Sequence, residues 1–237
     1  LAQKGIRFSN AYTTCPSCIA ARRSLLSGRF PSAHGMVGYR DRQEWHPENT
    51  LPGVLSDAGF QTCWAGRSMH QWPPRKKFGF EKIIQIDHRN GDHNDYGEWL
   101  ERNQPSGSGG HYGSGAMHND YIGRPWHMNE GCHATNWTVN QALDFLEKRD
   151  PEKPFFLTVS FIAPHPPLVP PQFYFDRYLR TGVNDPFVGE WAVKPETYGT
   201  PRKKQGPVDL QGELLLCARA GYYGLINHID DQIWRLT

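Results

Sequence analysis

The side chains best suited to chemistry in this sequence begin with a cysteine and an arginine about one helical turn apart. Cys18 stands where a loop gives way to a helical pattern, and Arg22 follows it by four residues, close to the same face of the helix start. A thiol or an anion at a helix N-terminus is favoured by the helix dipole and by the free backbone N–H groups. Because a guanidinium group donates two hydrogen bonds to a tetrahedral oxyanion at once, the pair indicates an anion pocket beside a thiol.

Three further polar side chains follow segments that have the composition of β-strands. Arg67 and His70 come after the segment 61–65, and His165 comes after the segment 155–162. In open α/β sheets, ligands bind outside the carboxyl ends of the strands. We therefore expect these three side chains to contribute to the same kind of pocket as the thiol.

The elements that must position these residues alternate between helix and strand. The segment 155–162 is almost entirely apolar or β-prone, which predicts a strand buried on both faces. Thr50 is a good N-cap, and Pro52 suits the first turn of a helix that Gly59 ends. Such alternation is typical of an α/β fold with a mainly parallel sheet flanked by helices. Helices are expected to begin at Cys18, Thr50, Thr135 and Glu213, and strands to cover 8–12, 61–65 and 155–162.

The spacing of apolar residues predicts which helix faces are buried and which segments are loops. Residues 105–115 have the composition of a flexible surface loop, and residues 172–210 have no regular pattern. The expected buried faces are Leu51, Val54, Leu55 and Ala58 on the helix after Thr50, and Tyr222, Leu225, Ile226, Ile229 and Ile233 on the last helix.

Composition narrows the function classes. The 237 residues are 21% charged and 38% hydrophobic, which indicates a globular chain rather than a disordered one. A net charge of +2 is too small to indicate a nucleic-acid partner. We find no run of 18 apolar residues that would span a membrane. Five scattered cysteines do not form the pattern of a disulfide framework.

The segment 18–29 resembles the signature of the formylglycine-dependent (type I) sulfatases of the alkaline phosphatase superfamily. It reads Cys-Ile-Ala-Ala-Arg-Arg-Ser-Leu-Leu-Ser-Gly-Arg, and the family signature is Cys-x-Pro/Ala-Ser/Ala-Arg-x-x-Leu-x-Ser/Thr-Gly-Arg. Its Cys, Arg, Leu and Gly-Arg fall in register across twelve positions. The resemblance also covers the lead-in 5–12, the helix 50–60, the segment 154–166 and the last helix, 222–235.

The resemblance implies an alkaline-phosphatase-like α/β fold and a hydrolase of sulfate monoesters of carbohydrates or aryl alcohols. It implies that residues 1–237 are part of a single catalytic domain, in which the loops 71–135 and 172–210 are insertions that form the pocket. Both ends look like truncations, so we expect an internal fragment that lacks both termini and is inactive alone. The family suggests a periplasmic, secreted or lysosomal location. In the pocket loops, Trp72 and Trp126 are candidates for stacking on a sugar or aryl ring.

In this family the signature cysteine, here Cys18, is oxidised after synthesis to formylglycine, whose hydrate is the nucleophile. Arg22 matches the arginine that orients the hydrate. His165 matches the histidine that contacts sulfate and protonates the leaving oxygen, a task that its ordinary pKa near neutrality suits. The maturation implies a formylglycine-generating maturase as a partner.

Gly66-Arg67-Ser68-Met69-His70 resembles the family's Gly-Lys-x-His segment, in which lysine neutralises sulfate charge and histidine assists the hydrate. Arg67 is therefore the expected sulfate-binding residue and His70 a catalytic one. The segment departs from the family in two ways, because arginine replaces lysine and one extra residue separates it from the histidine.

The resemblance also implies a divalent cation, most often calcium, which is bound by Cys18 as formylglycine. The family's paired aspartates correspond to sequence upstream of this chain, and its late Asp with Asn or His corresponds to sequence downstream. We therefore expect the other metal ligands to lie outside this chain.

Three alternatives stay open at the level of the sequence. Phosphonate monoester and phosphodiester hydrolases of the same superfamily carry the same signature, so it does not separate sulfur from phosphorus. A catalytically silent, sulfatase-like binding protein would share the fold. Cys15 and Cys18 are also spaced like a redox pair or half of a zinc site.

Overall fold

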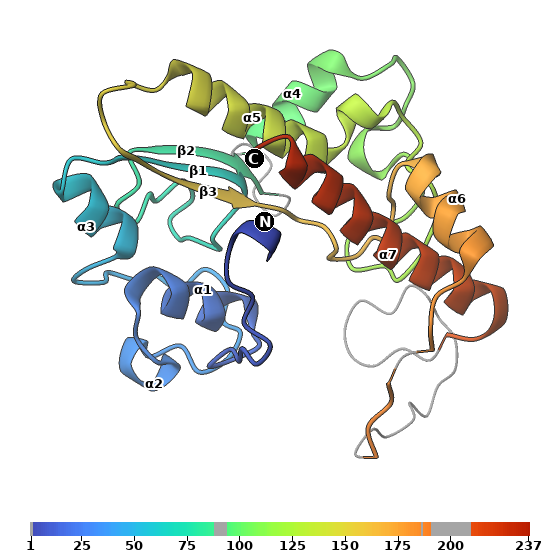
Figure 1. Cartoon of the computed structure of the whole chain (residues 1–237), viewed down its shortest axis with the longest axis horizontal. Helices are drawn as coiled ribbons and strands as arrows, with labels where there is room; N and C mark the ends of the chain where they lie inside the picture. Colours follow the sequence, from blue (N-terminus) through green and yellow to red (C-terminus); the bar gives the residue numbers. More distant parts are fainter. Residues whose placement is uncertain (1, 88–93, 186, 191–209) are drawn as a thin grey trace. The chain divides into compact units, whose positions relative to one another are not determined.

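The computed structural model describes residues 2–87, 94–185, 187–190 and 210–237, and the chain divides into two compact units (Figure 1). The first unit comprises Leu1–Asp95, Asn140–Ser160 and Thr237, and the second comprises Tyr96–Val139 and Phe161–Leu236. The expectation of one catalytic domain over residues 1–237 stays a prediction. No helix among the described residues is long and apolar enough to cross a membrane.

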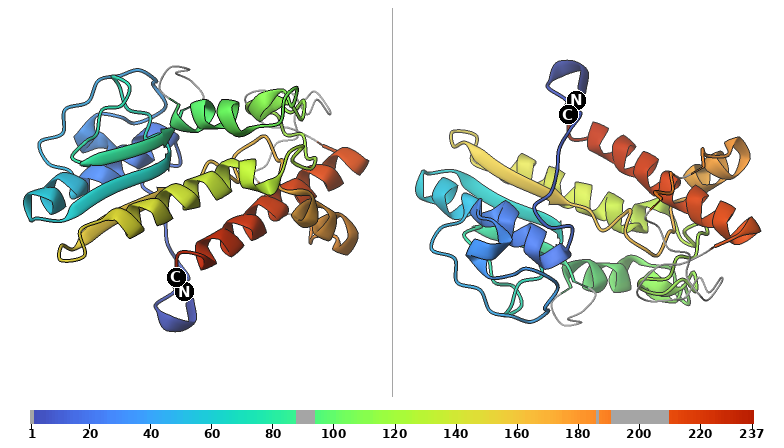
Figure 2. Two further views of the ribbon diagram at one scale, coloured as in Figure 1. Left: turned by 90° about the horizontal axis from the view of Figure 1, so that it is seen from above. Right: turned by 90° about the horizontal axis from the view of Figure 1, so that it is seen from below.

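The first unit contains a parallel sheet in the strand order β2-β1-β3 (Figures 1 and 2). Its strands are β1, Gln61–Arg67, β2, Lys82–Ile86, and β3, Phe155–Ser160. In the register of the sheet, Arg67 lies opposite Ile86, and Gly66 lies opposite Ser160. The carboxyl ends of all three strands therefore meet at one edge. The parallel sheet and the helices around it confirm the predicted α/β fold.

The three strand predictions need correction in burial or in extent. Burial differs because it depends on the position of a strand in the sheet. β1 pairs on both sides and is buried over residues 62–66, whereas β3 pairs on one side and is half-buried or exposed along its length. β3 also ends at Ser160, before residue 162, and β1 continues beyond residue 65 to Arg67. The prediction of a strand at 8–12 is wrong, since this segment is exposed and pairs with no strand in the described part of the chain.

Two predicted helices are confirmed, one with the glycine expected at its C-terminal end and the other with the expected N-cap. α1, Cys18–Ser27, ends at Gly28, which adopts the left-handed φ of 67°. α3, Leu51–Asp57, begins after Thr50, whose hydroxyl accepts from the Gly53 N–H at 3.1 Å and donates to the Phe78 carbonyl at 2.6 Å. The apolar face predicted for α3 is wrong, because Leu51 and Val54 are exposed. The first unit also contains η1, Ala2–Lys4, and α2, Pro31–His34.

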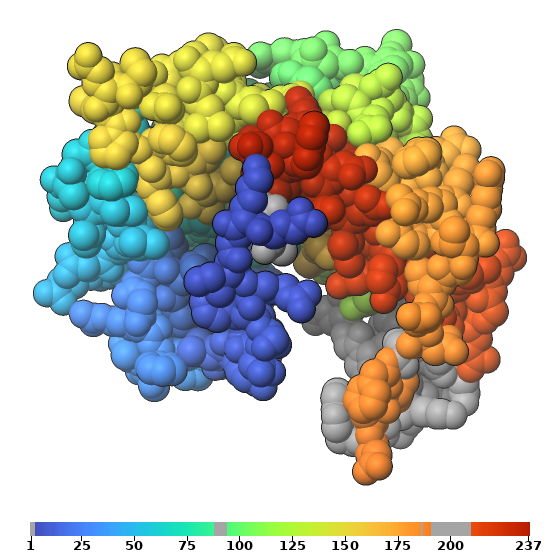
Figure 3. Space-filling model, in the orientation of Figure 1, coloured from blue at the N-terminus to red at the C-terminus, as the bar shows by residue number. Residues whose placement is uncertain are grey.

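The second unit contains the helices of the C-terminal part of the chain. α6, Gln172–Thr181, and α7, Gly212–Trp234, lie side by side, coloured orange and red in Figures 2 and 3. α6 contradicts the prediction that 172–210 is irregular, although about half of that range, 186 and 191–209, lies outside the described residues. The other helical elements of the described residues are α4, Asp95–Asn103, η3, Gly110–Tyr112, η4, Glu130–Cys132, and α5, Ala134–Lys148.

The buried face of α7 differs from the predicted one. Leu225 is buried as predicted, whereas Tyr222 and Ile226 are about two-fifths exposed, and the other buried residues of the helix are small or polar. A side chain at Gly221 would collide with the Leu168 carbonyl oxygen, and a Cβ at Gly224 would come within 2.8 Å of the Pro170 ring. The helix therefore packs closely through its glycines, a contact that a pattern of large apolar residues does not reveal. The buried residues of α7 are Ala218, Ala220, Gly221, Gly224, Leu225, His228 and Gln232.

Candidate active site

Cys18 is the first residue of α1, and the side chain of the preceding residue, Ser17, does not cap the helix. Ser17 is extended and makes no side-chain capping hydrogen bond, although its carbonyl accepts the first helical bond, from the Ala21 N–H at 2.8 Å. The free N–H groups of the first turn are therefore not taken by a cap, and they favour an anion at this point. Cys18 is partly exposed, as a reactive position requires.

The neighbouring cysteine has a different environment. Cys15 packs against the buried cluster of Ile19, Ala20 and Met36, and its sulfur lies 3.9 Å from the Val37 carbonyl oxygen. Cys15 and Cys18 are both free thiols in the structure. The structure therefore distinguishes Cys15, which packs against a buried cluster, from Cys18 at the helix start. The spacing in the sequence does not make this distinction.

The two adjacent arginines of α1 have separate roles. Arg23 is buried, donates to the Gln43 carbonyl at 2.9 Å, and places its guanidinium 5.1 Å from the centre of the Trp45 ring. Burial lowers the pKa of the Arg23 guanidinium. Arg22 is only partly buried. Arg23 thus anchors the helix, and Arg22 is the arginine of α1 that is accessible to a ligand.

Arg67 and His70 lie at and beyond the carboxyl end of β1. Arg67 is the last residue of the strand, and its carbonyl accepts the Trp64 indole N–H at 2.9 Å. His70 is buried, has a φ of 57°, and sets its ring edge-on to Tyr39 with centroids 5.9 Å apart. A histidine in the left-handed region is uncommon, and such conformations concentrate at functional sites. The chain therefore turns sharply at His70 instead of running straight on from the strand.

A hydrophobic cluster connects α1 to this edge of the sheet. Leu26 of α1 packs with Trp64 of β1 and with Met69, which lies between Arg67 and His70. The helix that begins at Cys18 is therefore packed against the segment that carries the two predicted residues of the strand end. All of these contacts lie within the first unit.

Sequence reasoning missed a carboxylate at the same edge. Asp87 directly follows β2, is 3% exposed, and its backbone N–H donates to Asn94 Oδ1 at 3.4 Å. The signal was available, because three of the five residues 82–86 are β-branched isoleucines, which favours a strand, and Asp87 ends it. Nearby, the buried Gln71 donates to Gln85 Oε1 at 2.6 Å.

His165 belongs to the second unit and lies in the loop after β3. Its Nδ1 lies 2.8 Å from the Pro166 carbonyl oxygen. Because a carbonyl only accepts, Nδ1 carries the proton of that bond, and Nε2 is the nitrogen that gains or loses a proton. The ring stacks on that of His118, with centroids 5.4 Å apart and planes inclined by 15°. His118 was not predicted from the sequence.

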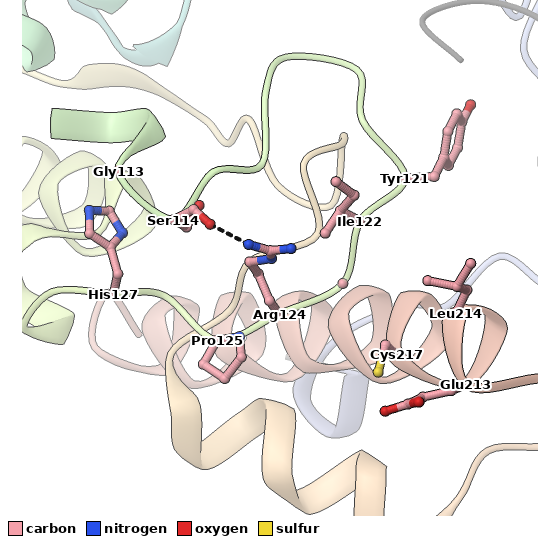
Figure 4. Close-up of a pocket in the computed structure, with 11 residues that line it drawn as sticks. Gly113, Ser114, Tyr121, Ile122, Arg124, Pro125, His127, Glu213, Leu214 and Cys217 are labelled. Carbon is pink, nitrogen blue, oxygen red and sulfur yellow. Dashed lines mark hydrogen bonds between the residues drawn. The ribbon is translucent and has the colours of Figure 1, made fainter. Parts of the chain in front are cut away.

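The second unit also contains a pocket of about 710 Å³ along the start of α7 (Figure 4). Arg124 crosses it and donates to the Ser114 carbonyl at 2.6 Å, with Glu213 and Cys217 on the helix side. Burial and the nearby Glu213 raise the pKa of the Cys217 thiol, which disfavours a reactive thiolate there.

The two tryptophans proposed to stack on substrate differ. Trp126 is buried with Ala116 and Val169, and its indole N–H donates to the Asn129 carbonyl at 3.3 Å. It is therefore a core residue, and its predicted role as a stacking surface is wrong. Trp72 is partly exposed, and the Arg42 guanidinium lies over its ring, 5.8 Å from the ring centre.

No group of three or more His, Cys, Asp or Glu side chains that could hold a metal ion is present within residues 2–87, 94–185, 187–190 and 210–237. The described residues therefore do not form a metal site by themselves. The assignment of Cys18, as formylglycine, to a calcium site stays a prediction that needs ligands from elsewhere.

Solved structures with similar folds define the class of protein. A phosphonate monoester hydrolase of Agrobacterium radiobacter superposes with a TM-score of 0.70 at 16% identity, covering 94% of this chain and 50% of that one. A protein in complex with its substrate D-glucosamine-2-N,6-O-disulfate superposes with a TM-score of 0.62 at 19% identity, covering 99% and 55%. The fold is thus the alkaline-phosphatase-like α/β fold of sulfatases and their relatives.

Sequence comparison narrows the class to a family. The family model described as Sulfatase matches residues 1–237. An arylsulfatase of Clostridium perfringens is 40% identical over 256 residues, covering 99% of this chain and 52% of that protein. A choline-sulfatase of Rhizobium meliloti is 26% identical, covering 100% and 47%. The chain belongs to the sulfatase family, and it spans about half the length of these relatives.

Proposed function

We propose that this chain carries the nucleophile of a sulfuric ester hydrolase, and that Cys18, converted to formylglycine, is that nucleophile. The observation that carries the proposal is the position of Cys18 at the uncapped start of α1, in register with the family signature. An oxygen nucleophile and a sulfate group are both favoured at free N–H groups of a helix start. The arylsulfatase relative, at 40% identity over nearly the whole chain, supports sulfate as the group transferred.

In the first half of the reaction, one hydroxyl of the formylglycine hydrate attacks sulfur. A new S–O bond forms to the enzyme as the attacking hydroxyl releases its proton, and the S–O bond to the alcohol breaks, which gives a covalent sulfo-enzyme intermediate. The released proton balances the one that the leaving alcohol receives. Arg22 orients the hydrate, and Arg67 neutralises charge on the sulfate oxygens. An arginine suits the second role because it stays charged and donates two bonds to an oxyanion.

The alcohol leaves as its oxygen receives a proton from His165. The Nδ1–H of this ring is held by the Pro166 carbonyl, so Nε2 is the donor. Proton donation by a positioned side chain typically contributes 10²–10⁴-fold. It matters most for alkyl and sugar alcohols, which are poor leaving groups without a proton.

In the second half, the remaining hydroxyl of the intermediate loses its proton, and His70 is the base that assists. The C–O bond to sulfate then breaks, sulfate leaves, and the aldehyde of formylglycine is restored. No water attacks sulfur in this scheme, because the geminal hydroxyl expels sulfate, and a water molecule rehydrates the aldehyde for the next turnover. The buried position of His70 and its turn at a strand end support this assignment.

A divalent cation, most often calcium in this family, would add electrostatic stabilisation of the hydrate and the sulfate oxygens. The substrates we propose are sulfate monoesters of carbohydrates or aryl alcohols. The arylsulfatase relative and the neighbour solved with D-glucosamine-2-N,6-O-disulfate support that range. Phosphonate monoesters are the second candidate, favoured by the similarity in fold to a phosphonate monoester hydrolase.

The test uses the full-length protein, co-expressed with a formylglycine-generating maturase. Wild type is incubated with a 4-nitrophenyl sulfate and with a phosphonate monoester of the same phenol, and sulfate is measured by ion chromatography. We expect sulfate release, which Cys18→Ala abolishes and the matched Cys15→Ala retains, since Cys15 lies outside the signature and packs, partly buried, against Ile19, Ala20 and Met36. Sulfate release by Cys18→Ala would refute the mechanism. If wild type hydrolyses only the phosphonate, the substrate would be a phosphonate monoester and not a sulfate ester.

A further inference from the structure

We infer that His118 is a positioning residue for the proton donor His165, an inference that rests on the proposed function. The two imidazole rings stack almost in parallel, with centroids 5.4 Å apart and an interplanar angle of 15°. His118 is exposed and His165 is half-buried, so the pair lies at the surface that a ligand can reach. The sequence pattern gave no sign of the pairing, because the two residues are far apart along the chain.

The backbone that carries His118 is a turn closed by two hydrogen bonds. The Asp120 N–H donates to the Met117 carbonyl at 3.0 Å, and Asp120 Oδ2 accepts the Met117 N–H at 2.8 Å. Asp120 is 1% exposed, so this carboxylate is committed to holding the turn. Asn119 takes the left-handed position of the turn with a φ of 65°, a conformation that asparagine tolerates well. His118 is therefore fixed on a rigid support.

The segment that carries His118 is joined to the segment that follows His165. The Leu168 N–H donates to the Ile122 carbonyl at 3.2 Å, and the Arg124 N–H donates back to the Leu168 carbonyl at 3.2 Å. A third bond runs from the Trp126 N–H to the Pro170 carbonyl at 2.7 Å. These bonds form a short parallel bridge centred on Gly123 and Leu168.

Side-chain packing strengthens the same junction. Ala116, two residues before His118, is buried in one cluster with Trp126 and Val169, and Val169 lies four residues after His165. Backbone bonds and apolar packing thus fix both ends of the contact between the two rings. The backbone of this unit therefore determines that the two rings stack.

The stack has a function that the hydrogen bond to Pro166 cannot supply. A single bond from Nδ1 selects the tautomer of His165, but the ring can still tilt about its Cβ–Cγ bond within the range that this hydrogen bond allows. A flat neighbour against one face removes this freedom and keeps Nε2 in one direction. When His165 is protonated, a neutral aromatic face is also a favourable contact for the cation. Small displacements of a catalytic group cost large factors in rate, so orientation has a measurable effect.

The test compares His118→Ala, which removes the stack, with His118→Phe, which keeps a flat ring but has no ring nitrogen. Met117→Ala is the matched control, because it truncates an exposed side chain of the same turn and keeps the N–H that Asp120 binds. The full-length, matured enzyme is assayed on an alkyl sulfate and on 4-nitrophenyl sulfate, and kcat and KM are determined separately. Thermal unfolding checks that each variant is folded.

We expect His118→Ala to lower kcat on the alkyl sulfate by about 10-fold, with KM changed less than about 2-fold. The activated aryl ester needs little proton donation, so its kcat should change less than about 2-fold. His118→Phe should restore kcat on the alkyl sulfate to within about 3-fold of wild type, and Met117→Ala should match wild type.

Four results would overturn the inference. Equal losses on both esters would show that His118 does not act through the proton donor. A rise in KM alone would make His118 a substrate contact, and a failure of His118→Phe to restore kcat would show that the imidazole is needed for its own chemistry. If wild type hydrolyses neither ester, the proposed function itself is refuted. If wild type is active and His118→Ala is equally active, only the role of His118 is refuted.

Discussion

His228 should make the stability of the protein depend on pH in the mildly acidic range. It lies on α7 with 0% exposure, and its Nε2 is 2.7 Å from Asn136 Oδ1. Because the amide oxygen only accepts, Nε2 carries the proton, and Nδ1 is the buried atom for which the described residues provide no hydrogen-bond partner. Protonating Nδ1 would therefore bury a charge and an unbonded N–H, and burial lowers the pKa of His228 to about 4.

The neighbours of His228 do not reverse this effect. Glu130 Oε1 lies 3.4 Å from Nε2, but its side chain is 42% exposed, so solvent weakens its attraction for the imidazolium. Tyr174 packs beside the ring, and Asp231 bonds to that tyrosine rather than to the histidine. His133 meets the ring edge-on at 4.8 Å, and its own pKa is lowered by burial and then by His228. The pair therefore favours neutral rings in the folded protein.

The sign of the effect follows from proton binding. The unfolded chain binds a proton at His228 with a pKa of about 6.5, whereas the folded protein binds it only near 4. Between these values the unfolded state binds more protons, so stability is complete above about pH 6.5 and falls as the pH is lowered towards 4. With these two pKa values, proton binding at His228 in the unfolded chain lowers the free energy of unfolding by roughly 2–3 kcal/mol between pH 7.5 and 4.5.

The assay is chemical denaturation of the full-length protein at pH 7.5, 6.5, 5.5 and 4.5, for wild type, His228→Gln and His46→Gln. Glutamine keeps an N–H for Asn136 but does not titrate, so the variant should lose roughly 2–3 kcal/mol less stability than wild type over this range. His46 is an exposed histidine, with 73% of its side chain accessible, and its variant should follow wild type. Parallel profiles for wild type and His228→Gln would refute the reasoning.

Two further predictions separate catalysis from packing. His165→Ala should lower kcat by about 10²–10⁴-fold on an alkyl sulfate but less than about 10-fold on 4-nitrophenyl sulfate, and equal losses on the two esters would remove its role as the acid. Arg22→Ala should lower kcat/KM by about 10²-fold with an unchanged melting temperature, whereas Arg23→Ala should cost roughly 1–3 kcal/mol of stability through its lost bond to Gln43. A loss of stability in Arg22→Ala and a loss of activity in Arg23→Ala would contradict the assignment of the two arginines. Steady-state kinetics measures the activity, and thermal unfolding measures the stability.

Local signals predicted local structure well. The helix after Cys18 and its end at Gly28 were predicted because a helix start and a left-handed glycine are set by neighbouring residues. The Thr50 cap was predicted for the same reason. The burial of β3 was not, because which strand lies in the middle of a sheet depends on pairing between distant segments. On α7 only Leu225 was predicted correctly as fully buried, and the rest of the buried face was missed because glycine and histidine, at Gly221, Gly224 and His228, form its contacts.

The candidate site divides along the same line. The predicted residues Cys18, Arg22, Arg67 and His165 came from a signature and from strand ends, and their catalytic roles stay predictions. Asp87 was missed because β2 was not recognised. The partnership of His118 with His165 was missed because it depends on a bridge between two loops that are remote in sequence. Trp126 was misassigned because composition alone does not separate a buried aromatic residue from an exposed one.

The central claim is that Cys18 is converted to formylglycine, and mass spectrometry tests it directly. The full-length protein is produced with a formylglycine-generating maturase, and the tryptic peptide 8–22 is analysed, which contains both Cys15 and Cys18. Cys15 is the internal control, because it precedes the signature and packs in the cluster with Ile19. The account predicts an aldehyde or its hydrate at Cys18 with Cys15 still a thiol. Two unmodified thiols, or a disulfide between them, would contradict it.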